Sequence, residues 1–547
     1  MLNIISALLL ECPFYQLIMA MKTLLEYASD SMLTTLLIKE RAKCRRRNRD
    51  DKKHVIEKDC DISQLSTRKQ LSCMMPPRYT WICPSKRKRQ KQANGSNDCQ
   101  KNVEKSLLLT IYRDRELQKE GTHFRYLNQL DAFISQIRKR IATNDLKLET
   151  PHLTPIFKDK EKKDDGTWLV TCRPLSVYTQ LEEKIILSVT SRYLTRYFNR
   201  YLHENILSYR PARKFRDKTH YVTDFNDGIE MIKQFREVHD SETIYAADCD
   251  IKKFYDIIPH QVVRDCFNNL LQQSGLSDEG KGQVMNVLNA YLDSYSFCTN
   301  AKQYAQQNSH VFNKIRAKFH DKDNLNTYQI KWVDEIEQQA PEQYSHLGVP
   351  QGGALSLIIA NVVLNDVDKT IIANDDPNRL FIRYCDDMIL LHTDYSQCCQ
   401  LMQQYADSLK KHGLFYHRFE DVAQCSPKHF WQIKSHLPFL WGDGEDNDNR
   451  YIGFLGYELR RDGRIRLRKS NMQRFADKFK RRRYALRRYR KKHDQEEFID
   501  HQEQVLDTIL KGVEFYKSLN PQFKSGSQYN HLKKLRKRTE LGPLPTY

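Results

Sequence analysis

The sequence lacks the features that mark secreted and membrane proteins. It contains no unbroken apolar run of the about 20 residues that span a bilayer. Residues 1–20 are apolar, but no basic segment precedes them and Glu11 interrupts them, so we expect neither a signal peptide nor a membrane anchor. The fourteen cysteines are scattered and show no disulfide framework. These absences predict a cytoplasmic protein without a membrane partner.

Acidic residues are also in short supply. The 89 Lys and Arg residues exceed the 69 Asp and Glu residues, which leaves a net charge of +20. Such an excess is typical of a protein with a polyanionic partner, most simply nucleic acid, although a basic tail on an ordinary enzyme gives the same balance. Basic runs within residues 41–105 favour a linker or loop-rich segment. The cysteines and histidines of that segment lack the paired spacing of a zinc site.

Apolar periodicity predicts the order of helices and strands. We expect helices over residues 1–40, 106–148, 180–196, 221–238, 357–367, 400–412 and 496–519, and a basic amphipathic helix within residues 464–492. We expect strands or hairpins over residues 150–175, 243–251, 380–382, 388–391 and 451–459. The segment 262–345 is predicted to be a helical, insertion-like connection. The central β-α-β-β order indicates a mixed sheet with helices on one face.

An adjacent pair of aspartates, Asp386 and Asp387, lies between the last two central strands. Two like charges repel each other, so water or a cation must offset the repulsion. A solvated hairpin tip is the simplest interpretation, but the apolar flanks indicate a buried hairpin. Asp250, at the end of the strand over residues 243–251, supplies a third carboxylate. Three such carboxylates can hold two Mg²⁺ ions about 3.5–4 Å apart, which suits in-line nucleotidyl transfer.

Six short motifs surround these carboxylates. They are C-R-P-L at 172–175, Y-R-P at 209–211, D-I-K-K-F-Y-D at 250–256, G-V-P-Q-G-G-A-L-S at 348–356, Y-C-D-D at 384–387 and F-L-G-Y at 454–457. In this order they resemble fingers motifs 1 and 2 and palm motifs A, B, C and E of reverse transcriptases. The likeness is strongest to bacterial group II intron and retron-like enzymes, and among these to the defence-associated or abortive-infection group.

The resemblance, which covers roughly residues 150–470, implies an α+β fold of the right-hand polymerase type. The implied units are a helical and basic N-terminal extension over residues 1–105, fingers over 106–240, a palm over 241–460 and a basic helical thumb over 461–547. The palm includes the insertion 262–345. Aromatic residues between the basic residues of the thumb suggest a face that grips backbone phosphates, with a merely solvated helix as the alternative.

The resemblance also implies residue roles. Catalysis and the binding of two Mg²⁺ ions, or Mn²⁺ in their place, fall to Asp250, Asp386, Asp387 and the backbone carbonyl of Ile251. The dNTP would contact Lys163, Arg173, Tyr255, Gln351 and Gly352. The primer and template would contact Arg210, Tyr384, Phe454, Leu455 and Gly456.

Three of these roles carry open alternatives. Tyr255 falls where the family has an aromatic gate against the ribose 2′-hydroxyl, but a core aromatic also fits a position after a strand. Arg173 is the candidate for the triphosphate, and a salt bridge within the fingers is its alternative. The motif D lysine of the family has no clear counterpart, which leaves Lys428 and Lys434 open.

The expected function is that of an RNA-directed DNA polymerase that makes cDNA from dNTPs. The implied partners are a non-coding RNA template, the cDNA product and a second copy of the chain, in a role in antiphage defence. No RNase H, integrase or HNH endonuclease segment is recognised. Template-independent or protein-primed synthesis by the same fold is one alternative. A catalytically silent nucleic-acid-binding scaffold is another, and the intact set of three aspartates argues against it.

Overall fold

The computed structural model describes residues 23–44, 65–83, 96–143, 145–162, 164, 168–211, 213–214, 221–222, 225–297, 328–330, 346–422, 425–442, 451–490, 498–499, 501–503, 505–506 and 527–541. Several sequence predictions lie wholly or partly outside these ranges, among them the helices over residues 1–40 and 496–519, the role of Lys163 and the second half of the insertion 262–345. Among the helices within these ranges, none is long and apolar enough to cross a membrane.

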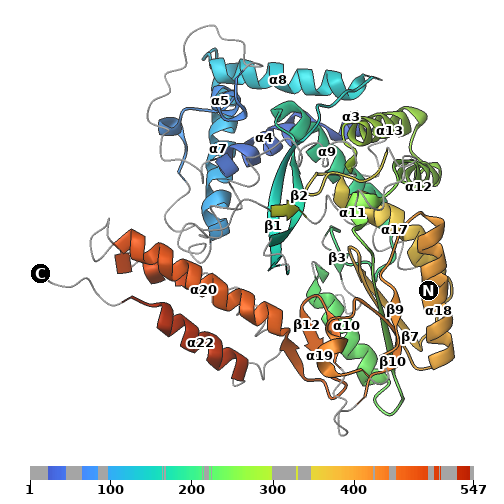
Figure 1. Ribbon diagram of the computed structural model, residues 1–547. Coiled ribbons are helices and arrows are strands. Elements are labelled where there is room, and N and C mark those ends of the chain that lie inside the picture. The colour runs from blue at the N-terminus through green and yellow to red at the C-terminus, as the bar shows by residue number, and fades with distance from the viewer. Residues whose placement is uncertain are drawn as a thin grey trace, which may run out of the picture.

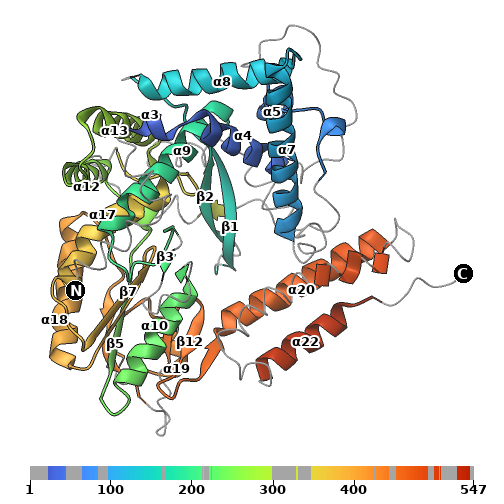
Figure 2. The same cartoon turned by 180° about the vertical axis from the view of Figure 1, so that it is seen from behind.

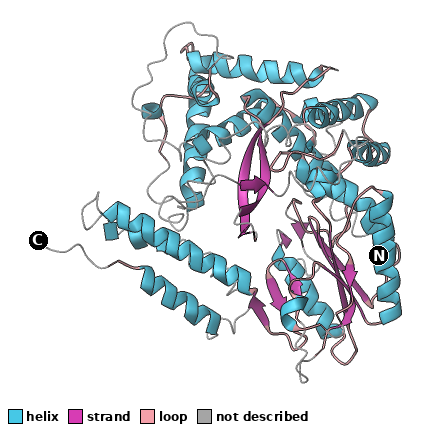
Figure 3. Cartoon of the chain, in the orientation of Figure 1, coloured by secondary structure: helices cyan, strands magenta, loops and turns pink. Residues whose placement is uncertain are grey.

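A five-stranded sheet, called the palm sheet below, is the largest of the sheets in the described part of the chain and lies at the lower right in Figure 3. Its order is β7-β8-β5-β10-β9, with β5 (Tyr245–Asp250), β7 (Arg379–Tyr384), β8 (Asp387–His392), β9 (Phe419–Glu420) and β10 (Ser435–Leu440). Neighbouring strands are antiparallel except β9, which runs parallel to β10. The predicted mixed sheet is therefore confirmed, and its register pairs Asp250 directly with Asp387.

Both faces of the palm sheet are buried, because successive residues of its strands enter two different hydrophobic cores. In β8, Met388 and Leu390 belong to the first core, whereas Ile389 and Leu391 belong to the second. Such alternation is what a strand buried on both faces requires, since successive side chains point to opposite faces. The strands therefore read as continuous apolar runs in the sequence.

Helices cover both faces of the palm sheet, so the prediction of helices on one face alone is wrong. The first core contains residues of α12 (His260–Gln272), α17 (Ser356–Ile372) and α18 (Tyr395–Lys411), and α18 contacts β5, β8 and β10 (Figure 1). On the second face, α10 (Phe225–Val238) packs against β7 through the stripe of Ile229, Ile232 and Phe235. A period of three to four residues gives such a stripe.

The N-terminal half is largely helical and shares the first core. It contains α3 (Leu24–Tyr27), α4 (Asp30–Cys44), α5 (Thr67–Cys73), η3 (Arg78–Thr80), α7 (Ser96–Lys119), α8 (Arg125–Ala142), α9 (Leu181–Phe198) and η4 (Asn199–Tyr201). Buried Val103, Leu107 and Ile111 form one stripe of α7, which packs against α4. The predicted boundary after residue 105 thus falls inside α7. The described part of residues 41–105 is also more helical than the expected loop-rich linker.

The region between the N-terminal helices and the palm sheet contains two small sheets. The first is ordered β1-β2-β6, from β1 (His152–Lys162), β2 (Trp168–Val177) and β6 (Tyr328–Ile330); the second pairs β3 (Arg213–Lys214) with β4 (Tyr221–Val222). The hairpin predicted over residues 150–175 is confirmed.

The segment 262–345, which the sequence predicts to be a helical, insertion-like connection, is mostly helical in its described part. Two helices, α12 and α13 (Asp278–Asp293), bury Val263, Phe267, Val284 and Leu288 in the first core. Strand β6 of the same segment pairs with β2 in parallel. The polar residues of the two helices lie on their outer faces, which explains the insertion-like composition.

The C-terminal part attaches to the second core. A sheet of β11 (Ile452–Phe454), β12 (Tyr457–Leu459) and β13 (Ile465–Leu467) follows α19 (Pro427–Phe430) and leads into α20 (Lys469–Arg490). Helix α20 packs against α22 (Ser527–Thr539), and the pair extends away from the palm sheet in both views (Figures 1 and 2). Helix α20 buries Phe475, Phe479 and Leu486 and exposes its arginines, which confirms an amphipathic basic helix.

A buried ion pair joins the palm sheet to α17. Arg383 of β7 and Asp368 of α17 are both 0% exposed, and the Arg383 Nη2 to Asp368 Oδ2 distance is 2.7 Å. The Nε of Arg383 also donates to both oxygens of Asp368, at 2.8 and 2.9 Å. Removing one partner of such a pair leaves a buried charge without compensation, which typically costs about 3–5 kcal/mol.

We therefore predict that Arg383→Met lowers the free energy of unfolding by about 3–5 kcal/mol. Urea denaturation followed by intrinsic fluorescence measures this loss. The double variant Arg383→Met with Asp368→Leu should recover most of it, because no unpaired charge remains in the core. The control is Arg115→Met, which removes a surface pair with Asp131 and should cost below about 1 kcal/mol. A single Arg383 variant no less stable than this control would contradict the assignment.

Candidate active site

The three predicted carboxylates meet at one end of the palm sheet. Asp250 is the last residue of β5, Asp387 is the first residue of β8, and the two are paired across the ladder. Asp386 lies in the turn between β7 and β8, next to Asp387. The chain thus brings together residues that are 136 positions apart in sequence, as predicted from the motifs.

The turn that carries Asp386 is strained and firmly held. Cys385 has a φ of 61°, in the left-handed region that residues with a Cβ rarely adopt. Its backbone N–H donates to Ser208 Oγ at 2.9 Å, and Arg383 Nη1 donates to its carbonyl oxygen at 2.8 Å. A strained residue persists only where the surroundings determine its conformation, and such residues gather at functional sites.

Burial and charge repulsion raise the pKa values of Asp386 and Asp387. Burial raises the pKa of Asp386, and the nearby charge of Asp250 raises it further, whereas Arg173 lowers it. Burial, Asp386 and Asp250 together raise the pKa of Asp387 to about 6. The side chain of Asp387 is nevertheless more than a third exposed, so a cation in solution can reach it. A divalent cation would relieve the repulsion that raises both pKa values.

The donor set fits hard divalent cations, which prefer carboxylate and carbonyl oxygens. Ile251 follows Asp250 directly and is buried, so any contribution from it would come from its backbone carbonyl. Among the described residues, the three carboxylates do not form a group whose ligand atoms all lie within 4.8 Å of one another. Two ions about 3.5–4 Å apart require ligands spread over a wider span than one ion does.

The loop at residues 348–356 is joined to the motif A turn by backbone and side-chain hydrogen bonds. Val349 N–H donates to the carbonyl of Tyr255 at 2.8 Å, and Gln351 Nε2 donates to Asp256 Oδ1 at 2.6 Å. On its other side the loop meets β2, where Ser176 N–H donates to the carbonyl of Gln351 at 2.9 Å. Gln351 therefore connects β2 to Asp256, which belongs to the same motif as Asp250.

Gly352 is required by both conformation and space. Its φ is 83°, and a Cβ built there would lie 2.4 Å from Leu175 Cδ1 of β2. A side chain at this position would separate the loop from the hairpin. The contact of Gly352 with a dNTP stays a prediction.

The predicted gate, Tyr255, lies beside the Y-C-D-D turn. Its hydroxyl is 3.2 Å from Cys385 Sγ, and burial raises its pKa above the ordinary tyrosine value. The ring is half-buried and packs against the first core, so the two interpretations of Tyr255 are compatible. Tyr384, in the same turn region, has its ring centroid 6.2 Å from that of Tyr209.

Two predicted arginines differ in their surroundings. Arg173 is exposed, and its positive charge lowers the pKa of Asp386 and of Asp256, which places it near the carboxylates. Arg210 instead donates to the carbonyl oxygens of Asn199, Leu202, His203 and Ile206. These bonds commit the Arg210 guanidinium to the end of α9 and the segment after it, and its predicted contact with primer or template stays untested.

The motif at 454–457 forms a tight turn between β11 and β12. Phe454 is buried in the second core, while Leu455 and Gly456 have φ values of 49° and 89°. The carbonyl of Gly456 accepts from Arg468 N–H and from Asn471 Nδ2, both at 3.0 Å. This turn is thereby fixed to the start of α20.

Two basic residues lie near the carboxylates; sequence reasoning left one of them, Lys434, as an open candidate and missed the other, Arg468. Lys434 Nζ lies 3.2 Å from Asp250 Oδ2, and its side chain is 60% exposed. Arg468 follows β13, and its charge lowers the pKa of Asp387. The sequence left Lys434 open beside Lys428, and the position of Lys434 just before β10, the strand that pairs with β5, was the available signal. For Arg468 the signal was a basic run directly after a glycine-rich turn.

Comparison with known proteins identifies part of the chain. The profile of a family described as reverse transcriptase (RNA-dependent DNA polymerase) matches residues 308–418, which include the loop at 348–356 and the Y-C-D-D turn. No protein of curated function matches the sequence.

Among solved structures, the fold is similar to that of apo telomerase from Candida tropicalis truncated from its C-terminal domain. The identity is 14% and the TM-score 0.33, over 58% of this chain and 55% of that one. Telomerase from Candida albicans, in complex with a TWJ fragment of telomeric RNA, is similar at 14% identity and a TM-score of 0.29, over 76% and 63%. The chain thus spans 55% and 63% of the lengths of these two proteins.

The family match covers the part of the chain that holds the loop at 348–356 and two of the three carboxylates. Reverse transcriptase domains generally use divalent metal ions, in agreement with the carboxylate donors described above. Residues 308–418, which contain Asp386 and Asp387, thus match the reverse transcriptase (RNA-dependent DNA polymerase) family, whose members are nucleotidyltransferases.

Proposed function

We propose that the chain makes cDNA from dNTPs on an RNA template, with Asp250, Asp386 and Asp387 as its metal-binding residues. The observation that carries the proposal is the ladder register that sets Asp250 opposite Asp387, with Asp386 next to it. Two Mg²⁺ ions, or Mn²⁺ in their place, would activate the primer 3′-hydroxyl and offset charge on the leaving pyrophosphate. The Asp250 and Asp387 pair is rigid because both strands are buried on both faces.

The surrounding side chains are proposed to position the nucleotide. The exposed Arg173 guanidinium suits the triphosphate, since its planar donors match phosphate oxygens. Gln351 and Gly352 would lie against the nascent base pair, and Tyr255 against the sugar. Lys434, with its ammonium 3.2 Å from Asp250, is a candidate for protonating or stabilising the pyrophosphate.

The primer and template would be held by the turn at 454–457, Tyr384 and the basic face of α20. Exposed arginines on α20 include Arg474, Arg481, Arg482, Arg483, Arg487 and Arg488. Neutralising backbone phosphates releases counterions, so this contact should weaken steeply with salt. The free thiols of Cys73, Cys249 and Cys385, among others, suit the proposed cytoplasmic location.

We further propose that the template is a non-coding RNA and that the protein acts in antiphage defence. Self-association of the chain is part of the same proposal. It rests on the likeness of the motif set to defence-associated reverse transcriptases. Sequencing the nucleic acid that co-purifies with the protein tests the template directly. If the protein instead makes DNA of a single repeated nucleotide when no RNA is present, template-independent or protein-primed synthesis is favoured.

We predict that Asp386→Ala with Asp387→Ala abolishes dNTP incorporation, because each lost charge-stabilising group costs on the order of 10²–10³-fold in rate. Incorporation of labelled dNTPs on an RNA template measures this, and a phage plaque assay with the same variant tests the defence role. The matched control is Asp375→Ala with Asp376→Ala, an adjacent pair before β7 and outside the site. Synthesis unchanged in the first variant would refute the polymerase assignment for these residues.

We predict that divalent-cation affinity falls as pH drops through about 6, where Asp387 takes up a proton. Titration of Mn²⁺ binding by electron paramagnetic resonance between pH 5 and 8 measures it. In the absence of metal, a fall in pH has the opposite effect and stabilises the folded protein. A pKa raised by folding means that the folded state favours protonated Asp387, so its stabilising contribution is present at low pH and is lost as pH rises through about 6.

The stability effect has its own test. In EDTA, Asp387→Asn should raise the melting temperature at pH 8 and change it little below pH 4. The exposed Asp145→Asn serves as the control and should show no such pH dependence. An Asp387 effect that is equal at both pH values would show that its carboxylate is not perturbed by the cluster.

We predict that Tyr255→Val lets the enzyme use ribonucleotides, with the preference for dNTPs reduced by about 10- to 200-fold. The reason is that the ring would no longer obstruct the 2′-hydroxyl. Tyr255→Phe is the matched control, because it removes only the hydroxyl that contacts Cys385 and keeps the ring. Competition between rNTP and dNTP in single-nucleotide extension measures the ratio. Equal ratios for Val and Phe would remove Tyr255 from the gate.

A further inference from the structure

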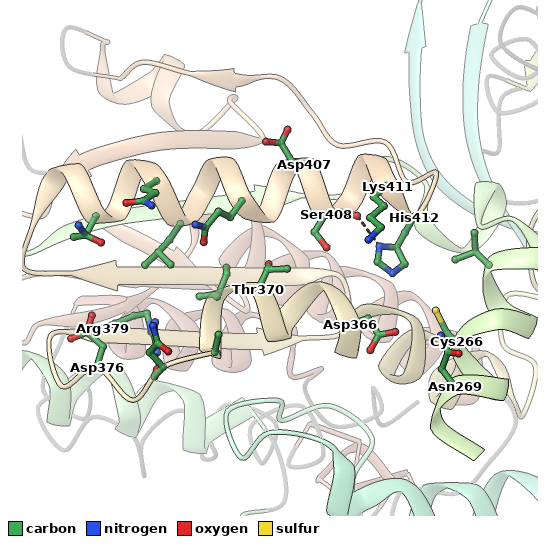
Figure 4. Close-up of a pocket in the computed structure, with 18 of the residues that line it drawn as sticks. Cys266, Asn269, Asp366, Thr370, Asp376, Arg379, Asp407, Ser408, Lys411 and His412 are labelled. Atoms are coloured by element: carbon green, nitrogen blue, oxygen red, sulfur yellow. Dashed lines mark hydrogen bonds between the residues drawn. The ribbon is translucent and has the colours of Figure 1, made fainter. Parts of the chain in front are cut away.

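A polar cavity lies behind the palm sheet, between α12, α17 and α18. Its volume is about 1080 Å³, and Asp250, Asp386 and Asp387 are not among its lining residues (Figure 4). The three helices are far apart in sequence, and each contributes polar side chains to the cavity wall. The proposed polymerase function assigns no role to this cavity.

One end of the cavity gathers three different metal-binding side chains. Cys266 comes from α12, Asp366 from α17, and His412 from the residue that caps α18. One ligand atom of each lies within 4.8 Å of the others, and Figure 4 shows the three side chains at the same end of the cavity. Within the described part of the chain, this is the only group of three or more such side chains that meets this distance.

The Cys266 thiol has the properties of a ligand without a partner. Its residue is only 5% exposed, yet it lines the cavity. Among the described residues it forms no hydrogen bond or ion pair. Cys266 packs at the edge of the first core, and its thiol also lies close to the Asp366 carboxylate and the His412 imidazole.

His412 is already oriented for a metal. Its Nδ1 lies 2.7 Å from the carbonyl oxygen of Ser408, drawn as a dashed line in Figure 4. Because a carbonyl only accepts, Nδ1 must carry the proton, which leaves the lone pair of Nε2 available. A hydrogen bond from the other ring nitrogen to a backbone carbonyl is the usual support of a metal-binding histidine.

The charges also match a divalent ion. One thiolate and one carboxylate neutralise a charge of two, and the imidazole stays neutral. Lys369 Nζ pairs with Asp366 Oδ1 at 2.9 Å, which leaves the other carboxylate oxygen for a metal. Asn269, one helical turn after Cys266, lines the same cavity and offers an amide oxygen, or water can complete the site.

We propose that Cys266, Asp366 and His412 bind a Zn²⁺ ion that joins α12, α17 and α18. The combination of sulfur, nitrogen and oxygen donors suits zinc, whereas Mg²⁺ and Ca²⁺ select oxygen ligands alone. The ion has a structural role, because it connects three helices that pack behind the catalytic strands. The site is independent of the proposed polymerase reaction and of its own metal ions.

Metal analysis of the full-length protein tests the site. After anaerobic purification we expect about one zinc per chain, and Co²⁺ substitution should give a thiolate-to-cobalt charge-transfer absorption. Cys266→Ser should lose both signals. Cys398→Ser, a buried thiol on α18 outside the cluster, is the matched control and should keep both. Retention of zinc by Asp386→Ala with Asp387→Ala would separate this site from the catalytic one.

A stability measurement keeps the test decisive if Cys266→Ser fails to fold. Added Zn²⁺ should raise the melting temperature of the chelator-treated protein by several degrees, since a ligand that binds only the folded state stabilises it. His412→Gln and Asp366→Asn, both at partly exposed positions, should abolish this rise, whereas Asp407→Asn in the same cavity should not. A zinc-free protein without a cobalt–thiolate band, or an equal rise in all variants, would overturn the proposal.

Discussion

The register between β5 and β8 is the constraint on which the rest of the site depends. Asp250 reaches Asp387 only in the pairing that also sets Ala247 opposite Leu390 and Cys249 opposite Met388. A slip of one residue would turn the apolar side chains of a strand toward the opposite core. Since both faces of the palm sheet are buried, such a slip would disrupt both cores at once. The hydrophobic effect thus fixes the position of the carboxylates.

That register brings together charges that the fold must tolerate. Burial and repulsion raise the pKa of Asp386 and Asp387, so the site is poised to accept cations. The adjacent turn keeps its shape because Ser208 and Arg383 hold Cys385 in a strained conformation. Arg383 is itself fixed by Asp368, so one buried ion pair connects the turn to the helix that follows the loop at 348–356. Rigidity at this point keeps the carboxylates aimed at a common space.

Much of this arrangement was predictable, and the reasons for the misses are physical. The hairpin around Asp386 and the strand ending at Asp250 are short, strongly apolar segments, so periodicity and motif order located them. The helix over residues 221–238 was predicted, but its position on the second face was missed, because a doubly buried strand reads as one apolar run and does not show that its two faces need separate cover. Lys434 and Arg468 approach the carboxylates through tertiary folding, so their local sequence gives only a weak signal of that approach. Arg383 in the middle of an apolar strand was a signal of a buried partner, but the sequence does not say that the partner is Asp368.

The helices behind the palm sheet follow the catalytic motifs directly in the chain. Helix α12 begins four residues after Asp256 of motif A, α17 begins at Ser356 of motif B, and α18 follows the strand that starts with Asp387. Their mutual packing therefore sets the distances between motifs A, B and C. Hydrophobic contacts between α12 and α17 and between α17 and α18 supply part of that constraint. A metal bound by one residue from each helix would fix all three from the side away from the substrate, where it places no obstacle in the path of nucleic acid.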